Sequence, residues 1–475
     1  MDTSPDVAER SVRSDLSSLF ASDAPATPSG ARAASTVAKT RATICVDGFN
    51  ISLAKGSGIA TYGRNLLSTI AELGMNGQVL YGPSAKRSPN NMLNEVALVD
   101  ADRPGPRLKK IDRFRRTLTS RFGRTAWPIK PGDEIIWPTR AGGKPDAQAY
   151  WAAHDLFHIA NRSFNAYRKE TPVGFDVSGD VARPDLMHWT ATLPLYARGV
   201  PNVYTIHDLI PLRLPHTTLD NKPAYLELCK TIARRADHIA VVSETTRQDV
   251  MRLLNVSEDR ITNTYQAVHL PAALTSRTEA DVTVELEGVF NLGWKGYFLH
   301  FGAIEPKKNL GRIVEAYLAS GLETPLIIVG GRAWLDEGET ALMNQVIQEK
   351  GPSGQRIRRY EYMPFSLLIS LIRGAKATLF PSLYEGFGLP VLESMALSTA
   401  VLTSTGGSLP EVAGDAAISV DPYDVQAMTR GLRALDADEA LRDDLVRRGL
   451  TQAAKFSVEA YQGRLSAMYG RLGLS

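Results

Sequence analysis

Short apolar runs rich in β-branched residues recur along the chain, and amphipathic stretches follow most of them. The first half has such runs at 43–46, 185–188, 203–207 and 238–243, with helical periodicity after 58 and at 225–236. The second half has runs at 297–302, 325–329, 358–363, 377–381 and 400–404. Strands that alternate with helices indicate parallel sheets covered on both faces. The pattern predicts an α/β protein with two doubly wound domains.

The length of 475 residues agrees with two domains, because single hydrophobic cores stop growing near roughly 250–300 residues. Residues 1–40 are rich in Ser, Ala, Asp, Thr and Pro and predict a disordered tail. Apolar periodicity fades between 276 and 296, which predicts a break there. We therefore expect an N-terminal domain at 41–290, a C-terminal domain at 291–456 and a final helical segment at 457–475.

The two cysteines, Cys45 and Cys229, are far apart and have no His or Cys at metal-ligand spacing. This argues against a disulfide framework and a zinc site and favours a reducing cytoplasm. No run reaches the roughly 18–20 apolar residues of a membrane span, and the N-terminus lacks the layout of a secretory signal. We expect a cytoplasmic protein that is neither exported nor integral to a membrane.

Basic residues concentrate between Arg103 and Lys130, where ten Lys or Arg accompany one acid, Asp112. Such concentration favours one anionic contact and argues against nucleic-acid binding, which spreads positive charge over a face. Apolar residues recur every three or four positions within 103–124 and predict an amphipathic basic helix. Two interpretations stay open: the helix packs on its domain and solvates its charges, or it rests on anionic lipid headgroups at the inner membrane face.

The most informative segment is 378–396, which reads TLFPSLYEGFGLPVLESMA. An apolar strand ends at Pro381, two glycines follow at Gly386 and Gly388, and Pro390 suits the first turn of a helix. Backbone amides at a helix N-terminus behind small residues bind anions, and a diphosphate fits such a site. Within the turn, the backbone of Gly386, Phe387, Gly388 and Leu389 is therefore expected to contact a nucleotide ligand.

Two carboxylates, Glu385 and Glu393, are eight positions apart on either side of this turn. Both can border one pocket as acceptors for hydroxyl groups. We expect Glu385 to contact a sugar and Glu393 to contact a ribose.

This segment resembles the Glu-x7-Glu signature of glycosyltransferase family 4, retaining enzymes of the GT-B fold. The resemblance continues through 302–317, 327–334 and 404–416, and is strongest toward mannosyltransferase-like members. It implies two Rossmann-like domains that face each other across a cleft, with acceptor in the N-terminal domain and nucleotide sugar in the C-terminal domain. It also implies that the final helix, 456–472, crosses back to the first domain.

The family usually offers an Arg and a Lys to the donor diphosphate. Here Ala303 stands at the Arg position, whereas Lys308 matches the Lys. We expect Lys307 to contribute the missing positive charge, because phosphate needs nearby charge more than one side-chain shape.

In the N-terminal half, residues 56–67 resemble the family's glycine loop and first helix, which places Gly58 near the ligand. The spacing departs from Gly-x-Gly-x-x-Gly and so weakens a dehydrogenase interpretation. His207 follows the apolar run at 203–206, where the family has an active-site His, and we expect it to be catalytic together with Glu385 and Lys308. His188 and His158 are further candidates for acceptor contact.

An Asp-x-Asp metal motif is matched by Asp100 and Asp102, but Asp436 and Asp438 repeat the same spacing in a charged helical stretch. Three-residue matches arise easily by chance, so we predict no metal requirement and no cofactor besides the nucleoside diphosphate sugar.

The resemblance implies transfer of a sugar, with GDP-mannose as the favoured donor, to a hydroxyl of a glycan or lipid-linked oligosaccharide in polysaccharide biosynthesis. Retention would come from same-face displacement, in which the departing phosphate takes the acceptor's proton. Two alternatives stay open. A sugar-nucleotide epimerase shares the two-domain architecture, and the alanine at 303 allows a catalytically inactive nucleotide-sugar-binding partner.

Overall fold

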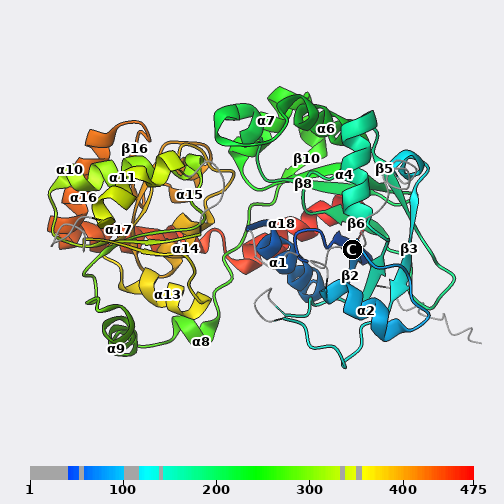
Figure 1. Cartoon of the computed structure of the whole chain (residues 1–475), viewed down its shortest axis with the longest axis horizontal. Helices are drawn as coiled ribbons and strands as arrows, with labels where there is room; N and C mark the ends of the chain where they lie inside the picture. The colour runs from blue at the N-terminus through cyan, green and yellow to red at the C-terminus, as the bar shows by residue number, and fades with distance from the viewer. Residues whose placement is uncertain are drawn as a thin grey trace, which may run out of the picture. The chain divides into compact units, whose positions relative to one another are not determined.

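The computed structural model describes residues 41–52, 58–100, 117–138, 143–331, 337–348 and 356–474. The predicted tail, 1–40, and most of the predicted basic helix, 103–124, lie outside the described residues. Within them the chain forms two separate β-sheets with helices on both faces (Figure 1). The α/β architecture predicted from the alternating pattern is confirmed.

The first sheet has the order β10-β9-β8-β6-β1-β2-β4-β3-β5-β7. Its strands are β1 (Thr43–Asp47), β2 (Asn76–Tyr81), β3 (Arg124–Ile129), β4 (Ala149–Ala152), β5 (Thr171–Phe175), β6 (Leu186–Trp189), β7 (Leu195–Ala197), β8 (Asn202–Ile206), β9 (His238–Val241) and β10 (Ile261–Asn263). Its helices are α1 (Gly58–Glu72), α2 (Asn91–Val99), α4 (Leu156–Tyr167), α5 (Ile210–Arg213), α6 (Lys222–Arg235) and α7 (Glu244–Leu254). The sheet is mixed, because β3 pairs with β4 antiparallel. The expectation of an entirely parallel sheet was wrong at this one pair of strands, beyond which β3, β5 and β7 are again parallel.

Successive strand residues in the first sheet enter two different cores, as the two-residue period of a strand requires. Val46 and Val79 pack in the cluster that contains α1 residues such as Leu66, whereas Cys45 and Leu80 pack in a second cluster with α4, α6 and α7. Both faces are therefore covered, which explains why the strands read as continuous apolar runs.

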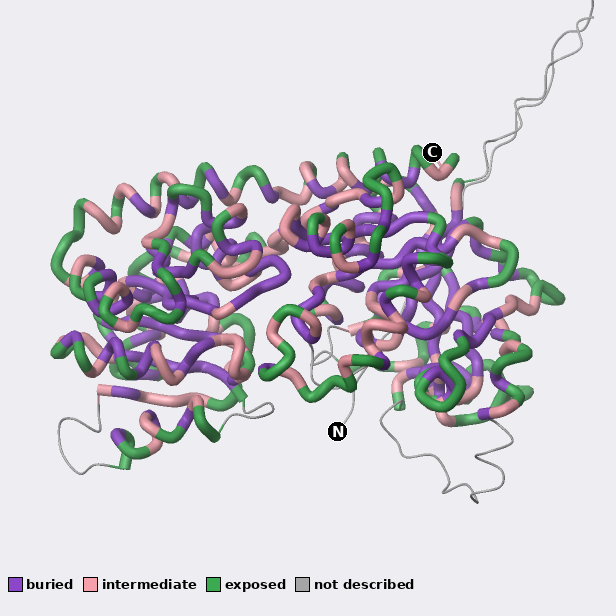
Figure 2. The backbone as a smooth tube through the Cα atoms, turned by 90° about the horizontal axis from the view of Figure 1, so that it is seen from above, coloured by how far each residue is buried: buried purple, intermediate pink, exposed green. Residues whose placement is uncertain are grey.

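The second sheet has the order β13-β12-β11-β14-β15-β16, and its pairs are all parallel among the described strands. Its strands are β11 (Phe298–Phe301), β12 (Leu326–Val329), β13 (Ile357–Tyr360), β14 (Ala377–Phe380), β15 (Ala400–Ser404) and β16 (Ile418–Val420). Its helices are α10 (Leu310–Ser320), α11 (Glu337–Gln348), α13 (Phe365–Gly374), α14 (Leu389–Ala396), α15 (Leu409–Ala413), α16 (Val425–Ala437) and α17 (Glu439–Ala454). Buried backbone runs through the centre of both sheets (Figure 2).

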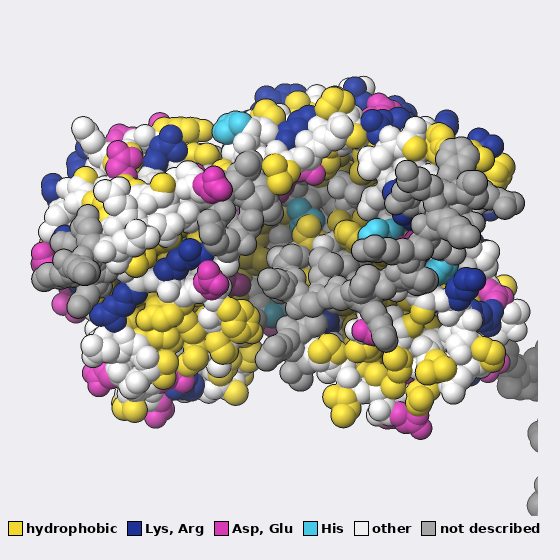
Figure 3. Space-filling view, viewed as in Figure 1, with side chains coloured by type: hydrophobic (Ala, Val, Ile, Leu, Met, Phe, Trp, Pro, Cys, Tyr) yellow, Lys and Arg dark blue, Asp and Glu magenta, His cyan; other side chains and the backbone are white. Residues whose placement is uncertain are grey.

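The predicted break at 276–296 falls between β10, the last strand of the first sheet, and β11, the first strand of the second. The segment is nevertheless helical: α8 (Ala272–Thr275) precedes it and α9 (Glu279–Phe290) lies within it. A capping box between Thr278 and Asp281 starts α9, which packs against α13 through Leu286. Hydrophobic side chains, including Phe365 of α13, remain exposed on this part of the molecule (Figure 3). Two exposed valines, Val284 and Val289, blur the helical periodicity of α9 and hid the helix from the sequence pattern.

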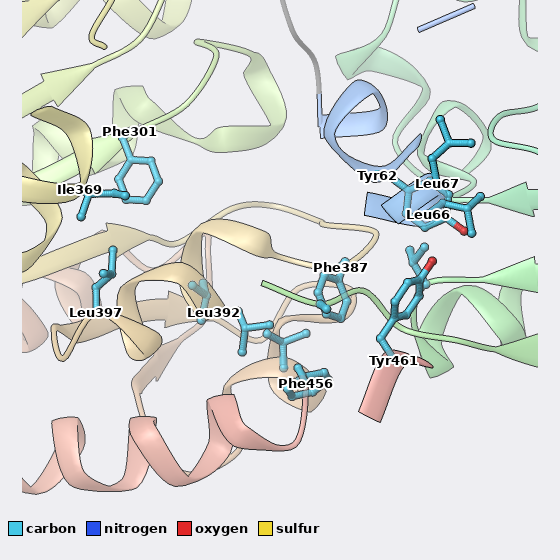
Figure 4. Close-up of a cluster of buried hydrophobic side chains, with 14 of the residues drawn as sticks. Tyr62, Leu66, Leu67, Phe301, Ile369, Phe387, Leu392, Leu397, Phe456 and Tyr461 are labelled. Carbon is cyan, nitrogen blue, oxygen red and sulfur yellow. The ribbon is translucent and has the colours of Figure 1, made fainter. Parts of the chain in front are cut away.

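The last helix, α18 (Val458–Arg471), contacts the first sheet and its helices. The Tyr469 hydroxyl lies 2.7 Å from Nδ1 of His188, and Gln462 donates a hydrogen bond to Glu72 of α1. One hydrophobic cluster extends from Leu66 of α1 past α18 to Leu392 of α14 (Figure 4).

Candidate functional site

The two sheets' strand ends meet where Gly386 follows β14 and His207 follows β8. A Cβ at Gly386 would lie 2.4 Å from the His207 carbonyl oxygen and 2.9 Å from Cβ of Asp208. No side chain fits at that distance, so this close backbone approach requires glycine. The Thr246 hydroxyl, on the first turn of α7, donates to the His207 carbonyl at 3.1 Å. Gly386 of the second domain and His207 of the first, both predicted from the sequence, therefore lie in contact.

Lysines and carboxylates form a compact ion cluster beside this contact. Nζ of Lys308 donates to Oε1 of Glu385 at 2.6 Å, and Nζ of Lys307 lies 3.8 Å from carboxylate oxygens of both Glu385 and Glu305. Burial alone would raise the pKa of Glu385, but the positive charges of Lys308 and Lys307 lower it below its ordinary value. Burial opposes the charge of Lys307, yet Glu385, Asp208 and Glu305 together raise its pKa. Glu385 and Lys307 are therefore both charged near neutral pH.

The turn after Glu385 has the backbone that an anion site needs. Gly388 has a φ of +109° and is the N-cap of α14, without a side-chain hydrogen bond to cap the helix. The Ser408 hydroxyl donates to the Phe387 carbonyl at 2.7 Å, and the Ser408 amide donates to the Glu385 carbonyl at 3.1 Å. The positive end of the α14 dipole consequently faces the turn, whose shape Ser408 maintains.

Glu393 lies one turn further along α14 and is half-buried. Burial raises its pKa to about 7, although the nearby charge of Lys308 opposes the rise. The two carboxylates that the sequence spacing paired therefore differ: Glu385 is held ionised by lysines, whereas Glu393 is half protonated near neutral pH.

His207 lies on the first-sheet side of the site. Its Nε2 is 2.8 Å from the Thr190 carbonyl oxygen, and the Tyr62 ring packs edge-on against the imidazole with centroids 4.9 Å apart. Burial lowers the pKa of His207, although the hydrogen bond to Thr190 and the charge of Asp208 oppose the shift. A neutral imidazole that donates through Nε2 has Nδ1 available as an acceptor.

The remaining predicted residues occupy different surroundings. The Phe387 side chain is buried against Phe456, with ring centroids 5.6 Å apart, so its backbone is the part that can face a ligand (Figure 4). Leu389 is the half-buried first residue of α14, and Gly58 is the exposed first residue of α1. How these residues contact a nucleotide stays a prediction.

The two other histidine candidates do not share the site. His188 is fully buried and bonded to Tyr469 and Thr205, and burial lowers its pKa to about 3. The expected acceptor contact of His188 is therefore wrong, because both ring nitrogens are already used. His158 is exposed on α4, with Asp155 at 4.0 Å.

The aspartates of the two Asp-x-Asp matches have structural partners where they are described. Asp436 forms an ion pair with Lys376 at 2.6 Å, and Asp438 caps α17 through the Leu441 amide. Asp102 lies outside the described residues. Among the described residues, no three or more His, Cys, Asp or Glu side chains form a group that could hold a metal ion.

Sequence reasoning missed three residues of the site: Glu305, Asp208 and Ser408. Glu305 is close in sequence to Lys307 and Lys308, and Asp208 follows His207. Both could therefore have been proposed as site residues from their position next to residues already predicted. Ser408 had no such signal, because its role depends on a loop after β15 that folds onto the turn after β14.

The two sheet domains meet at the turn that contains Gly386. Lysines and carboxylates lie on one side of this contact, and His207 lies on the other. This arrangement defines a glycosyltransferase of the GT-B fold. A sequence model of the glycosyl transferases group 1 matches residues 291–452, and one of Glycosyltransferase Family 4 matches residues 134–270. The O-antigen chain mannosyltransferase B of Escherichia coli is 35% identical over 264 residues, covering 54% of this chain and 67% of that protein. The chain belongs to glycosyltransferase family 4 and is mannosyltransferase-like.

Other relatives agree on the class. A serotype-specific mannosyltransferase WbdA of Escherichia coli is 31% identical over 277 residues, but the match spans only 33% of that protein's length. Among solved structures, sucrose-phosphate synthase from Thermosynechococcus elongatus has a TM-score of 0.62 at 17% identity, covering 91% of this chain and 99% of that one. Anabaena HepE, solved with UDP and glucose, has a TM-score of 0.59 at 12% identity, covering 91% of this chain and 100% of that one. These structural likenesses support the fold.

A membrane span would need a long apolar helix, and none of the helices in the described ranges is one.

Proposed function

We propose that this glycosyltransferase moves mannose from GDP-mannose to a hydroxyl of a glycan or lipid-linked oligosaccharide, with retention of configuration, in polysaccharide synthesis. The observation that carries the proposal is the position of the Glu385 and Lys308 pair, at a turn whose Gly386 touches the backbone of His207. The mannosyltransferase names of the relatives support the choice of sugar.

In the proposed complex the donor diphosphate lies against the N-terminus of α14 and the two lysines. Lys308 is already bonded to Glu385, so the phosphate would share a charge that the protein has fixed in place. Groups that are oriented before the reaction stabilise the charge of the leaving diphosphate without reorganisation. The Glu393 carboxylate would accept hydrogen bonds from the ribose, and Glu385 would orient the sugar.

His207 would face the anomeric carbon from the first domain, with its Nδ1 accepting a hydrogen bond from a sugar hydroxyl. Retaining glycosidases place two carboxylates about 5–5.5 Å apart around the bond, whereas the other carboxylates near Glu385, those of Glu305 and Asp208, act on the charge of Lys307. We therefore favour same-face displacement, in which the departing phosphate accepts the acceptor's proton while the acceptor oxygen forms the new bond.

Lys307, Lys308 and the α14 amides supply the positive charge that a divalent ion supplies in other transferases. We propose transfer without a metal. Activity that EDTA abolishes and Mg²⁺ or Mn²⁺ restores would contradict this part of the proposal.

The test is a panel of nucleotide sugars with mannose-containing oligosaccharides, free and lipid-linked, as acceptors. We expect release of GDP that depends on acceptor, and NMR of the product should show the donor's anomeric configuration. Glu385→Gln should abolish most turnover, whereas Glu361→Gln, an exposed glutamate on the same domain, should not. Epimerised nucleotide sugar without transfer would favour the epimerase alternative, and no turnover with every donor and acceptor would favour the inactive partner.

A further inference from the structure

Three neighbouring strands of the first sheet place polar groups in a row at their carboxyl ends. The strands β8, β6 and β1 are adjacent in the sheet, and the residues at or just after their ends are His207, Thr190 and Asp47. Ligands of doubly wound sheets bind at this edge, so the row leads from the candidate site into the domain's interior.

The hydrogen bond from His207 defines the tautomer of its ring. Nε2 lies 2.8 Å from the Thr190 carbonyl oxygen, which can only accept. Nε2 therefore carries the hydrogen, and Nδ1 has a bare lone pair. The Tyr62 ring packs edge-on against the imidazole, and the Tyr62 hydroxyl is fixed by Thr205 at 2.9 Å. The imidazole is thus held on two sides.

Asp47 holds the backbone that receives this hydrogen bond. Its carboxylate accepts from the Thr190 amide through one oxygen and from the Phe49 amide, at 3.2 Å, through the other. Asp47 is completely buried, and burial raises its pKa to about 6, although these backbone hydrogen bonds oppose the rise. A buried carboxylate is costly unless it is hydrogen-bonded, and the Thr190 and Phe49 amides are the partners that hold Asp47 in place.

We propose that Asp47 is a positioning residue for His207: by fixing the Thr190 backbone, it sets the tautomer and direction of the imidazole that faces the sugar. The inference rests on the proposed function, because the imidazole's task is to contact the transferred sugar. Asp47 itself touches no reacting atom.

The first test compares Asp47→Asn with Glu95→Gln. Either orientation of the amide leaves one of the two backbone N–H groups facing an NH₂ group, so the amide cannot hold the Thr190 and Phe49 segments together as the carboxylate does. Glu95 is a matched control, because it is equally buried in the same domain and accepts a backbone hydrogen bond from Gly132 at 2.7 Å, away from His207. We expect Asp47→Asn to lower kcat by about 10²-fold with donor KM unchanged, and Glu95→Gln to leave both unchanged.

A double-mutant cycle separates positioning from a general structural role. If Asp47 acts through His207, Asp47→Asn should lower kcat no further in a His207→Ala background. Additive losses, or an equal loss from Glu95→Gln, would overturn the proposal. Asp47→Ser retains one acceptor oxygen without the buried charge and gives a second variant if the amide variant does not fold.

Nitrogen NMR of ¹⁵N-histidine-labelled protein tests the same geometry without catalysis. Wild-type His207 should show a protonated Nε2 and an unprotonated Nδ1, and Asp47→Asn should show exchange between tautomers. A wild-type His207 protonated at Nδ1, or an unchanged spectrum in Asp47→Asn, would overturn the inference. Because this measurement needs no substrate, the inference can stand or fail even if no sugar transfer is found.

Discussion

Lys308 and Glu385 form an ion pair in which each partner is expected to have a second task at the donor. Their 2.6 Å contact buries both charged groups, with side-chain exposures of 13% and 10%. Removing one partner of such a pair leaves the other charge uncompensated. Substitutions here must therefore be judged for folding as well as for activity.

The two carboxylates of the turn should affect different steps. We expect Glu385→Gln to lower kcat by about 10²-fold, because the sugar and Lys308 lose their orientation, with a small change in donor affinity. We expect Glu393→Gln to weaken donor binding by about tenfold, the loss of a hydrogen bond to a charged group. Calorimetric titration with GDP-mannose and initial rates measure the two effects. Unchanged affinity and rate in both variants would refute the site.

Donor affinity should depend on pH through Glu393. Its pKa is raised to about 7, so ionisation across roughly pH 6–8 should strengthen ribose binding as pH rises. The sign for folding is opposite: because the folded pKa lies above the ordinary value of 4.5, this group's contribution to stability falls as pH rises from about 4.5 to 7. Donor affinity measured from pH 6 to 8 should rise in the wild type and stay flat in Glu393→Gln.

At the scale of the element, the turn between β14 and α14 has little room for change. In Gly386→Ala the new Cβ would collide with the His207 carbonyl and with Asp208, both backbone-anchored groups of the other domain. We expect turnover to fall at least tenfold, since displacements near 1 Å can cost about 10²-fold in rate. Gly288→Ala in α9, where a Cβ meets no atom within 4 Å, is the control and should keep full activity. Normal kinetics in Gly386→Ala would show that the domains need not meet there.

At the scale of the whole molecule, α18 ties the second domain's end to the first domain's core. Tyr469→Phe removes the hydrogen bond to buried His188 and leaves Nδ1 unpaired, which should lower the free energy of unfolding by about 1–3 kcal/mol. Gln462→Ala, on the exposed side of the same helix, should change it by less than about 0.5 kcal/mol. Urea denaturation measures the free energy of unfolding of both variants. Equal losses would show that the buried hydrogen bond stabilises the protein no more than the exposed one.

Membrane contact is a whole-molecule property that remains a prediction, because 103–116 lies outside the described residues. Replacing Lys109, Lys110, Arg113 and Arg116 with Ser should reduce binding to anionic vesicles without altering donor affinity. Each basic residue near an anionic surface contributes about 1 kcal/mol, so the loss should span orders of magnitude at low salt, and about 1 M salt should release the wild type. Flotation is the measurement. A wild type that never floats, or a variant that floats equally, would favour the solvated-helix interpretation.

The local structure of the candidate donor turn was largely predictable from sequence. Glu385, Gly388 and Glu393 belong to one strand–turn–helix unit, and their placement depends on local rules for glycine, proline and helix ends. The ion pair between Lys308 and Glu385 was not predictable, because those residues belong to different loops. The strands β3 and β10 were missed because partly exposed segments and three-residue segments have weak apolar patterns.

The sequence by itself determined the alternation of strands and helices, the two-domain architecture and the glycine turn after β14, because these depend on periodicity and local backbone preference. Only the tertiary structure decided that Gly386 touches His207, that His188 is a buried partner of Tyr469, and that Asp47 supports Thr190. Those contacts join residues that are 143 or more positions apart. No local pattern specifies such pairs, since strand order and the packing of loops across two sheets bring them together.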